Sequence, residues 1–78
     1  MIAGVVVETL PGAAERVGAR LGAAPGLALA GGDGDRRLAM VWEAEDGTAL
    51  EDLARQLLAA DPEVVGVFPT FVGQDQDA

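Results

Sequence analysis

The stretch "RRLAMVWEAEDGTALEDLARQLLAADPEVVGVFPTF", from Arg36 to Phe71, decides the fold of this chain. Its apolar run from Leu38 to Glu43 has the length and composition of a β-strand. Thr48 and Glu51 then form a capping-box pattern, which marks the start of a helix. A continuous apolar stripe follows at helical spacing: Leu50, Leu53, Ala54, Leu57 and Leu58.

The same stretch closes with a second strand. Pro62 ends the helix, and the apolar segment from Val64 to about Val72 is of strand composition. Pro69 interrupts this segment and cannot donate to a sheet ladder, which indicates an edge strand. The stretch therefore predicts one β-α-β unit.

The first half of the chain repeats this order. The β-branched run from Ile2 to Val7 predicts a buried central strand. A helix is expected from Ala13 until Pro25-Gly26 stops the pattern. Leu27 to Ala30 is of strand length, and the Gly-rich loop from Gly31 to Asp35 supplies the turn before the next strand. In the helix expected from Ala13, the apolar positions are Ala14, Val17 and Leu21.

The two halves align as "GVVVE…AAERVGARL…APGLALA" and "AMVWE…LEDLARQLL…DPEVVGV", at an offset of 35 to 37 residues. With right-handed crossovers, the order βαββαβ predicts a ferredoxin-like α+β two-layer sandwich. Four strands form an antiparallel or mixed sheet with both helices on one face. We expect the first and third strands to run parallel in the centre, in one domain (residues 1–72) followed by a flexible polar tail (residues 73–78).

Composition excludes several functions. Thirteen acidic residues against five Arg give a net charge of −8, which repels nucleic acid and anionic membranes and favours cationic partners. The chain has no His and no Cys, so we expect no metal site, no cofactor and no catalysis. The start "MIAGVVVETLPG" lacks a basic signal-peptide region, and no apolar run approaches a membrane span. We therefore expect a cytoplasmic protein, and we expect it to be a monomer.

Carboxylates near two strand ends suggest a binding rim. If the first and third strands are parallel neighbours, Glu8 and Glu43 end at the same edge, and Glu45 and Asp46 continue from it. Four acids would then converge there. Acid–base catalysis by such a pair would need an enclosed pocket, which a two-layer sandwich of this size hardly offers.

The strand alternation leaves two faces to choose from. One side carries Val6 and Val41, and the other could be either core or an exposed apolar platform for a peptide with arginines. Our prediction takes this second side as the platform. If this side packs on the helices instead, the side with Val6 and Val41 forms the platform. The predicted platform consists of Val5, Val7, Met40 and Trp42.

These motifs resemble those of the NapD family, the cytoplasmic chaperones of periplasmic nitrate reductase. The resemblance rests on "IAGVVVETLPG", on "LGAAPGLALAGGDGDRRLAMVWEAED" and on "VVGVFPTFV", and it covers nearly the whole chain. Gly73-Gln74 stands where family members usually have a Tyr-His pair. The resemblance implies a ferredoxin-like fold and a binding role rather than chemistry.

What the family implies is specific. Its members bind the twin-arginine signal peptide of the catalytic subunit as a helix across the sheet, and delay export until the molybdenum cofactor is inserted. Glu43, Glu45 and Asp46 would then meet the arginines and Glu8 would assist, beside the platform described above.

A second interpretation is a small-molecule regulatory domain of ACT type. "ETLPGAAERVGARL" looks like the strand–loop–helix entrance of such domains, where the loop backbone and the helix N-terminus hold an amino acid. Pro11-Gly12 is the motif that carries this alternative. It is equally a device for entering a helix.

Overall fold

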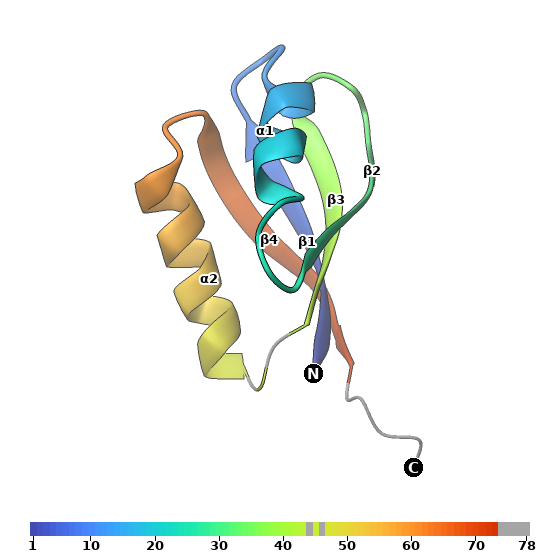
Figure 1. The fold of residues 1–78 in the computed structure, drawn as a ribbon, viewed down its shortest axis with the longest axis vertical. Coiled ribbons are helices and arrows are strands. Elements are labelled where there is room, and N and C mark those ends of the chain that lie inside the picture. The colour runs from blue at the N-terminus through green and yellow to red at the C-terminus, as the bar shows by residue number, and fades with distance from the viewer. Residues whose placement is uncertain (44, 46, 74–78) are drawn as a thin grey trace.

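A computed structural model describes residues 1–43, 45 and 47–73 of the chain. The elements follow the predicted order βαββαβ (Figure 1). The second helix begins at Gly47, one residue before Thr48, which therefore lies in its first turn. The bounds are β1 Ile2–Thr9, α1 Ala14–Leu21, β2 Leu27–Gly32, β3 Arg37–Glu43, α2 Gly47–Ala60 and β4 Val64–Gly73.

The four strands form one sheet in the order β2-β3-β1-β4, and every neighbouring pair is antiparallel. In the central pair, Ile2 lies opposite Glu43 and Glu8 lies opposite Arg37. The prediction of a parallel central pair is therefore wrong. Within each half of the chain, the helix connects two strands that are parallel to each other. In the sheet, however, a strand of the other half lies between these two strands. Neighbours across the sheet centre thus run in opposite directions.

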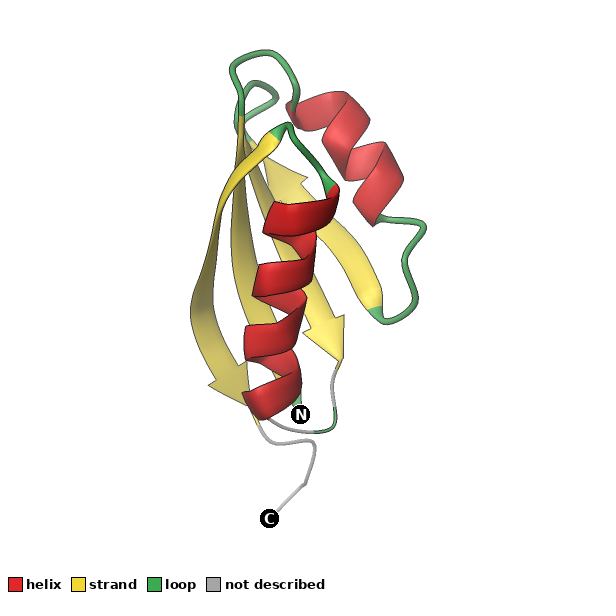
Figure 2. Cartoon of the chain, turned by 90° about the vertical axis from the view of Figure 1, so that its left-hand side faces the viewer, coloured by secondary structure: helices red, strands yellow, loops and turns green. Residues whose placement is uncertain are grey.

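Both helices lie on the same side of the sheet, as predicted, and the other side carries no helix (Figure 2). On β1, β2 and β3 alternate side chains point into the layer between sheet and helices. α1 supplies Ala14, Val17 and Leu21 to this core, which were the apolar positions expected for it. The buried apolar residues are Ala3, Val5, Val7, Ala13, Ala14, Val17, Leu21, Leu27, Leu38, Met40, Trp42, Leu50, Leu57 and Val64.

The strand β4 lies at a sheet edge, as Pro69 predicted. Its register against β1 shifts between Gly4, which pairs with Phe71, and Val5, which pairs with Pro69. One extra residue of β4 is accommodated there. Proline is tolerated at such an irregularity because the ladder of backbone hydrogen bonds is already interrupted.

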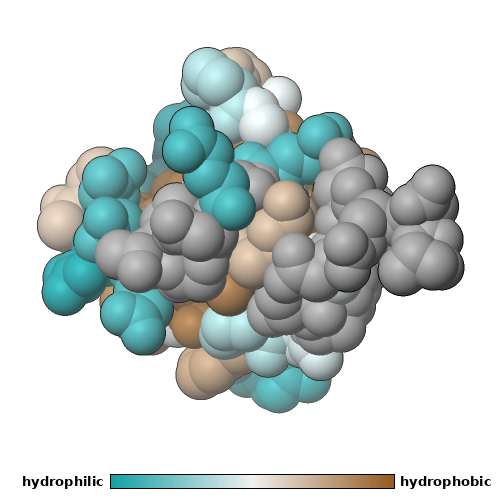
Figure 3. Space-filling view, turned by 90° about the horizontal axis from the view of Figure 1, so that it is seen from below, coloured by the Kyte–Doolittle hydropathy of each residue, from teal (hydrophilic) through white to brown (hydrophobic). Residues whose placement is uncertain are grey.

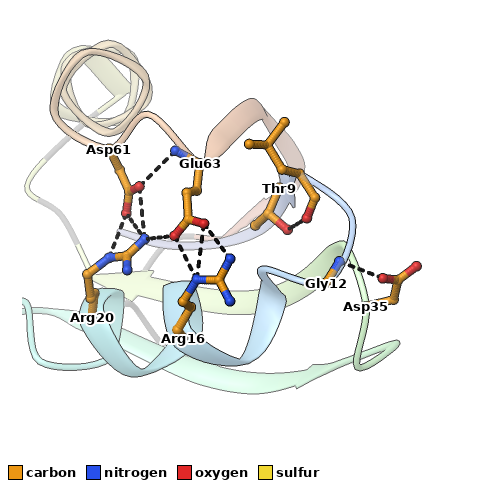
Figure 4. Close-up of polar contacts among 8 residues, drawn as sticks. Thr9, Gly12, Arg16, Arg20, Asp35, Asp61 and Glu63 are labelled. Atoms are coloured by element: carbon orange, nitrogen blue, oxygen red, sulfur yellow. Dashed lines mark hydrogen bonds and ion pairs between the residues drawn. The ribbon is translucent and has the colours of Figure 1, made fainter.

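A cluster of ion pairs ties α1 to the loop between α2 and β4 (Figure 4). Arg16 reaches both oxygens of Glu63, at 2.6 Å from Nη2 to Oε2 and 3.1 Å from Nε to Oε1. Arg20 makes a bidentate pair with Asp61, at 3.0 Å on each side, and a further bond of 2.8 Å to Glu63. Asp61 is buried and also accepts the backbone N–H of Glu63. The cluster holds two elements that are distant in sequence against each other.

The Arg16 and Arg20 guanidiniums lower the pKa of Glu63 to about 2. A lowered carboxyl pKa gives stability that is present above its ordinary value of 4.5 and is lost as the pH falls toward 2. We expect Glu63→Gln to lower the free energy of unfolding at neutral pH, with the difference from wild type shrinking between pH 4.5 and 2. Urea titrations followed by Trp42 fluorescence measure this. The matched control is Glu15→Gln, on α1. An equal change of the unfolding free energy with pH in both variants would contradict the prediction.

Candidate peptide-binding surface

The side of the sheet chosen as a platform is the core side. Val5, Val7 and Met40 are at most 1% exposed and Trp42 is 9% exposed. All four point toward the helices, and an exposed platform made of them is therefore a wrong prediction. The physical reason is size: the largest apolar side chains of the two central strands lie on this side, where helix packing removes them from water.

The opposite side of the sheet, the open face, carries the residues named as the replacement. Val6 and Val41 are half-buried there, on the two central strands. Phe68 lies opposite Val6 on β4 and is 53% exposed. Smaller residues, Gly4 and Ala39, complete the middle of this face. The open face therefore offers a shallow apolar strip of small side chains bounded on the β4 side by an aromatic ring.

The ring of Phe68 rests on a glycine. A Cβ placed on Gly66 would lie 2.6 Å from the nearest ring carbon of Phe68, well inside contact distance. Glu8 lies opposite Gly66 on β1. The ring thus occupies the space that a side chain at position 66 would need, an arrangement in which an aromatic side chain covers a glycine near a sheet edge. Phe68 is positioned rather than loosely exposed.

Two of the predicted rim acids lie at one end of the open face, which we call the Glu43 end. Glu43 is the last residue of β3, and Glu45 follows it; both are exposed. Asp46, the third, lies outside the described residues. Figure 3 views the molecule from this end, where hydrophilic residues and apolar surface lie close together.

Glu8 does not join this group. Because β1 and β3 are antiparallel, the C-terminal end of β1 lies at the far end of the open face, beside Arg37. We call it the Arg37 end. The convergence of four acids is therefore wrong, and the structure separates Glu8 from Glu43 by the length of the strand.

The loop that suggested an amino-acid site is already occupied by the chain itself. Gly12, at φ +79°, donates its N–H to Asp35 Oδ1 at 2.7 Å. The backbone N–H of Ala14 donates to the Asp35 carbonyl at 3.0 Å. A ligand carboxylate would need such amides. Asp35 thus already accepts hydrogen bonds from two of the amides at this loop and at the start of α1.

An apolar hollow of about 420 Å³ lies on the helix side, between α1 and the end of α2, beside Asp61 and Glu63. Both carboxylates are paired with arginines there. Another hollow, of about 280 Å³, lies between α1 and the strands β2 and β3, beside Leu29 and Leu38. In the part of the chain that the structure describes, no group of three or more His, Cys or acidic residues could hold a metal ion.

None of the helices among the described residues is long and apolar enough to cross a membrane.

Comparison with known structures finds a likeness in three dimensions that spans the whole of this chain. The solution structure of the E. coli Tat proofreading chaperone protein NapD superposes with a TM-score of 0.76, at 23% sequence identity, over 100% of this chain and 82% of that one. No protein-family profile matches the chain, and no curated protein sequence does. The likeness establishes the ferredoxin-like α+β fold and agrees with the resemblance drawn from the sequence motifs.

Proposed function

We propose that this protein is a cytoplasmic chaperone of the NapD type, which binds the twin-arginine signal peptide of a periplasmic nitrate reductase precursor. The observation that carries the proposal is the full-length likeness to a Tat proofreading chaperone. The open face supports it, because a sheet face without helices is the surface on which such a peptide would lie as a helix.

The chemistry of the open face suits this peptide. Twin-arginine signal peptides combine an arginine pair with an apolar stretch. Carboxylates accept charge-assisted hydrogen bonds from guanidinium groups. Glu43 and Glu45 are exposed and would accept such bonds from the arginine pair. The apolar stretch would pack on Val6, Val41 and Phe68, as an amphipathic helix packs in a groove. The net charge of −8 would speed the encounter with a cationic peptide.

The mechanism is competitive occupancy. While the open face covers the arginine pair, the export machinery cannot read it, and the precursor waits for its molybdenum cofactor. Release requires moderate affinity. A small, partly apolar surface with solvent-exposed ion pairs provides that, because exposed pairs contribute little to binding. The protein would act as a monomer, with no cofactor of its own.

Calorimetric titration with a synthetic twin-arginine signal peptide tests this function. We expect saturable binding that weakens with added salt and with an Arg-to-Gln peptide as control, because ion pairs with exposed carboxylates are screened. The emission of Trp42 should change little, since its side chain lies on the helix side of the sheet. An absence of binding heat with the arginine peptide at low salt would rule out the proposed function for that client.

A further inference from the structure

Gly66 lies on the open face and is nevertheless buried. It pairs with Glu8 on β1, and the neighbouring pair, Val7 and Val67, points to the core. A glycine has no side chain to shield its own backbone, so another group must cover it. The covering group is the Phe68 ring: a Cβ at position 66 would lie 2.6 Å from its Cε2 and 2.8 Å from its Cζ.

Space for the ring, rather than backbone conformation, requires a glycine at position 66. The φ angle of Gly66 does not lie in the positive region, so alanine can adopt its backbone conformation. The next nearest atom to the added Cβ is the Glu8 Cβ at 3.7 Å, an ordinary van der Waals contact. Rotation of the Phe68 ring about χ2 cannot remove the overlap, because Cζ lies on that rotation axis. A side chain at position 66 would therefore force the ring to change χ1.

The direction of the ring decides what else the open face exposes. Phe68 lies opposite Val6, and Ala39 is the next residue in this row, on β3. Val6 is only half-buried and Ala39 is exposed, so the ring leaves both accessible. A side chain has about three staggered χ1 positions, and a Cβ at position 66 removes the one that the ring adopts here.

From these contacts we infer that Gly66 is a positioning residue of the peptide-binding surface. It lets the Phe68 ring lie over position 66, where the ring is exposed to the apolar stretch of the peptide and leaves Val6 and Ala39 free to contact the same stretch. This inference rests on the proposed function and adds a residue that acts on the peptide through another side chain. An aromatic ring that is already positioned loses less freedom on binding than one that must first be ordered.

The position of the ring is tested first without peptide, by nuclear magnetic resonance. We expect nuclear Overhauser contacts between the Phe68 ring protons and the α protons of Gly66 in the wild-type protein, because ring carbons lie over that residue. Three-bond couplings to the Phe68 Cγ report χ1, which should differ between wild type and Gly66→Ala. Missing contacts in the wild type, or the same χ1 in both proteins, would overturn the inference before any peptide is added.

Calorimetry with the synthetic twin-arginine signal peptide tests the consequence for binding. We expect Gly66→Ala to weaken binding by about 10-fold, because the displaced ring no longer serves as an aromatic anchor. The urea midpoint of unfolding should stay close to that of wild type, which shows that the variant is folded. Unchanged affinity of the folded variant would overturn the inference.

Gly31→Ala is the matched control. Gly31 lies on β2, at the other edge of the sheet, and has no positive φ. Among the described residues, no heavy atom lies within 4 Å of a Cβ placed there. This variant should change neither the χ1 of Phe68 nor the affinity. An equal loss of affinity in Gly31→Ala and Gly66→Ala would mean that any added methyl group weakens binding, which also overturns the inference.

The double variant Gly66→Ala/Phe68→Ala shows whether the glycine acts through the ring. Its affinity should equal that of Phe68→Ala alone, because without the ring there is nothing for position 66 to position. A further loss in the double variant would mean that residue 66 affects the peptide directly, and would overturn the inference. If calorimetry detects no binding to wild type, the proposed function fails and this inference fails with it. If wild type binds and Gly66→Ala binds equally well, this inference alone fails.

Discussion

Met40→Ala is expected to lower the free energy of unfolding by about 2–5 kcal/mol, the usual cost of truncating a large buried apolar side chain. Met40 is 1% exposed and packs in the layer between sheet and helices. A domain of 78 residues has a total stability of roughly 4–12 kcal/mol. The variant should therefore lose a large part of its stability. Urea unfolding followed by Trp42 fluorescence measures the loss.

The neighbouring residue supplies the control. Val41 points to the open face and is half-buried, so Val41→Ala should cost about 1 kcal/mol or less. It should instead weaken binding of the signal peptide. Equal losses of stability in the two variants would mean that the core lies on both sides of β3, which contradicts the assignment of the faces.

Phe68→Ala is expected to weaken binding of the signal peptide by about 10-fold to 100-fold, because aromatic side chains that become buried in an interface often carry much of its binding energy. Among the described side chains, Phe68 has the largest exposed apolar one on the open face, and its ring lies over Gly66. The loss should appear in the calorimetric dissociation constant at both low and high salt, since the contact is apolar.

Leu58→Ala is the matched control for Phe68. Leu58 is 46% exposed but belongs to α2, on the other side of the sheet. Its truncation should leave the affinity unchanged. Circular dichroism and urea unfolding establish that Phe68→Ala remains folded. Unchanged affinity of folded Phe68→Ala would remove the open face as the site, and a loss in Leu58→Ala would move it to the helix layer.

Local sequence patterns predicted most of the fold. The positions of α1 and α2 follow from helical spacing, and Pro62 marks the end of α2. The end of α1 lies at Leu21, before the Pro25-Gly26 signal that was expected to stop it. The edge position of β4 follows from Pro69, because a residue that cannot donate a hydrogen bond is excluded from the middle of a sheet. The resemblance of three motifs to the NapD family agrees with the likeness in three dimensions.

The candidate site was only partly predictable. Glu43 and Glu45 were identified from the sequence, and the structure places both exposed at one end of the open face. Phe68, which the proposed function adds to the site, was not identified from the sequence, although its spacing of two from Gly66 was a usable signal.

The sequence by itself determined the order of the elements, their approximate bounds and the acidic character of the surface, since these depend on short-range propensity and on composition. Only the tertiary structure decided the directions of the central strands and the side of the sheet that faces the helices. Alternation places apolar residues on both sides of β1 and β3, so the periodicity was equally consistent with either side. Packing of the helices on the larger side chains resolved that ambiguity, and antiparallel pairing of β1 with β3 placed Glu8 and Glu43 at opposite ends of the face.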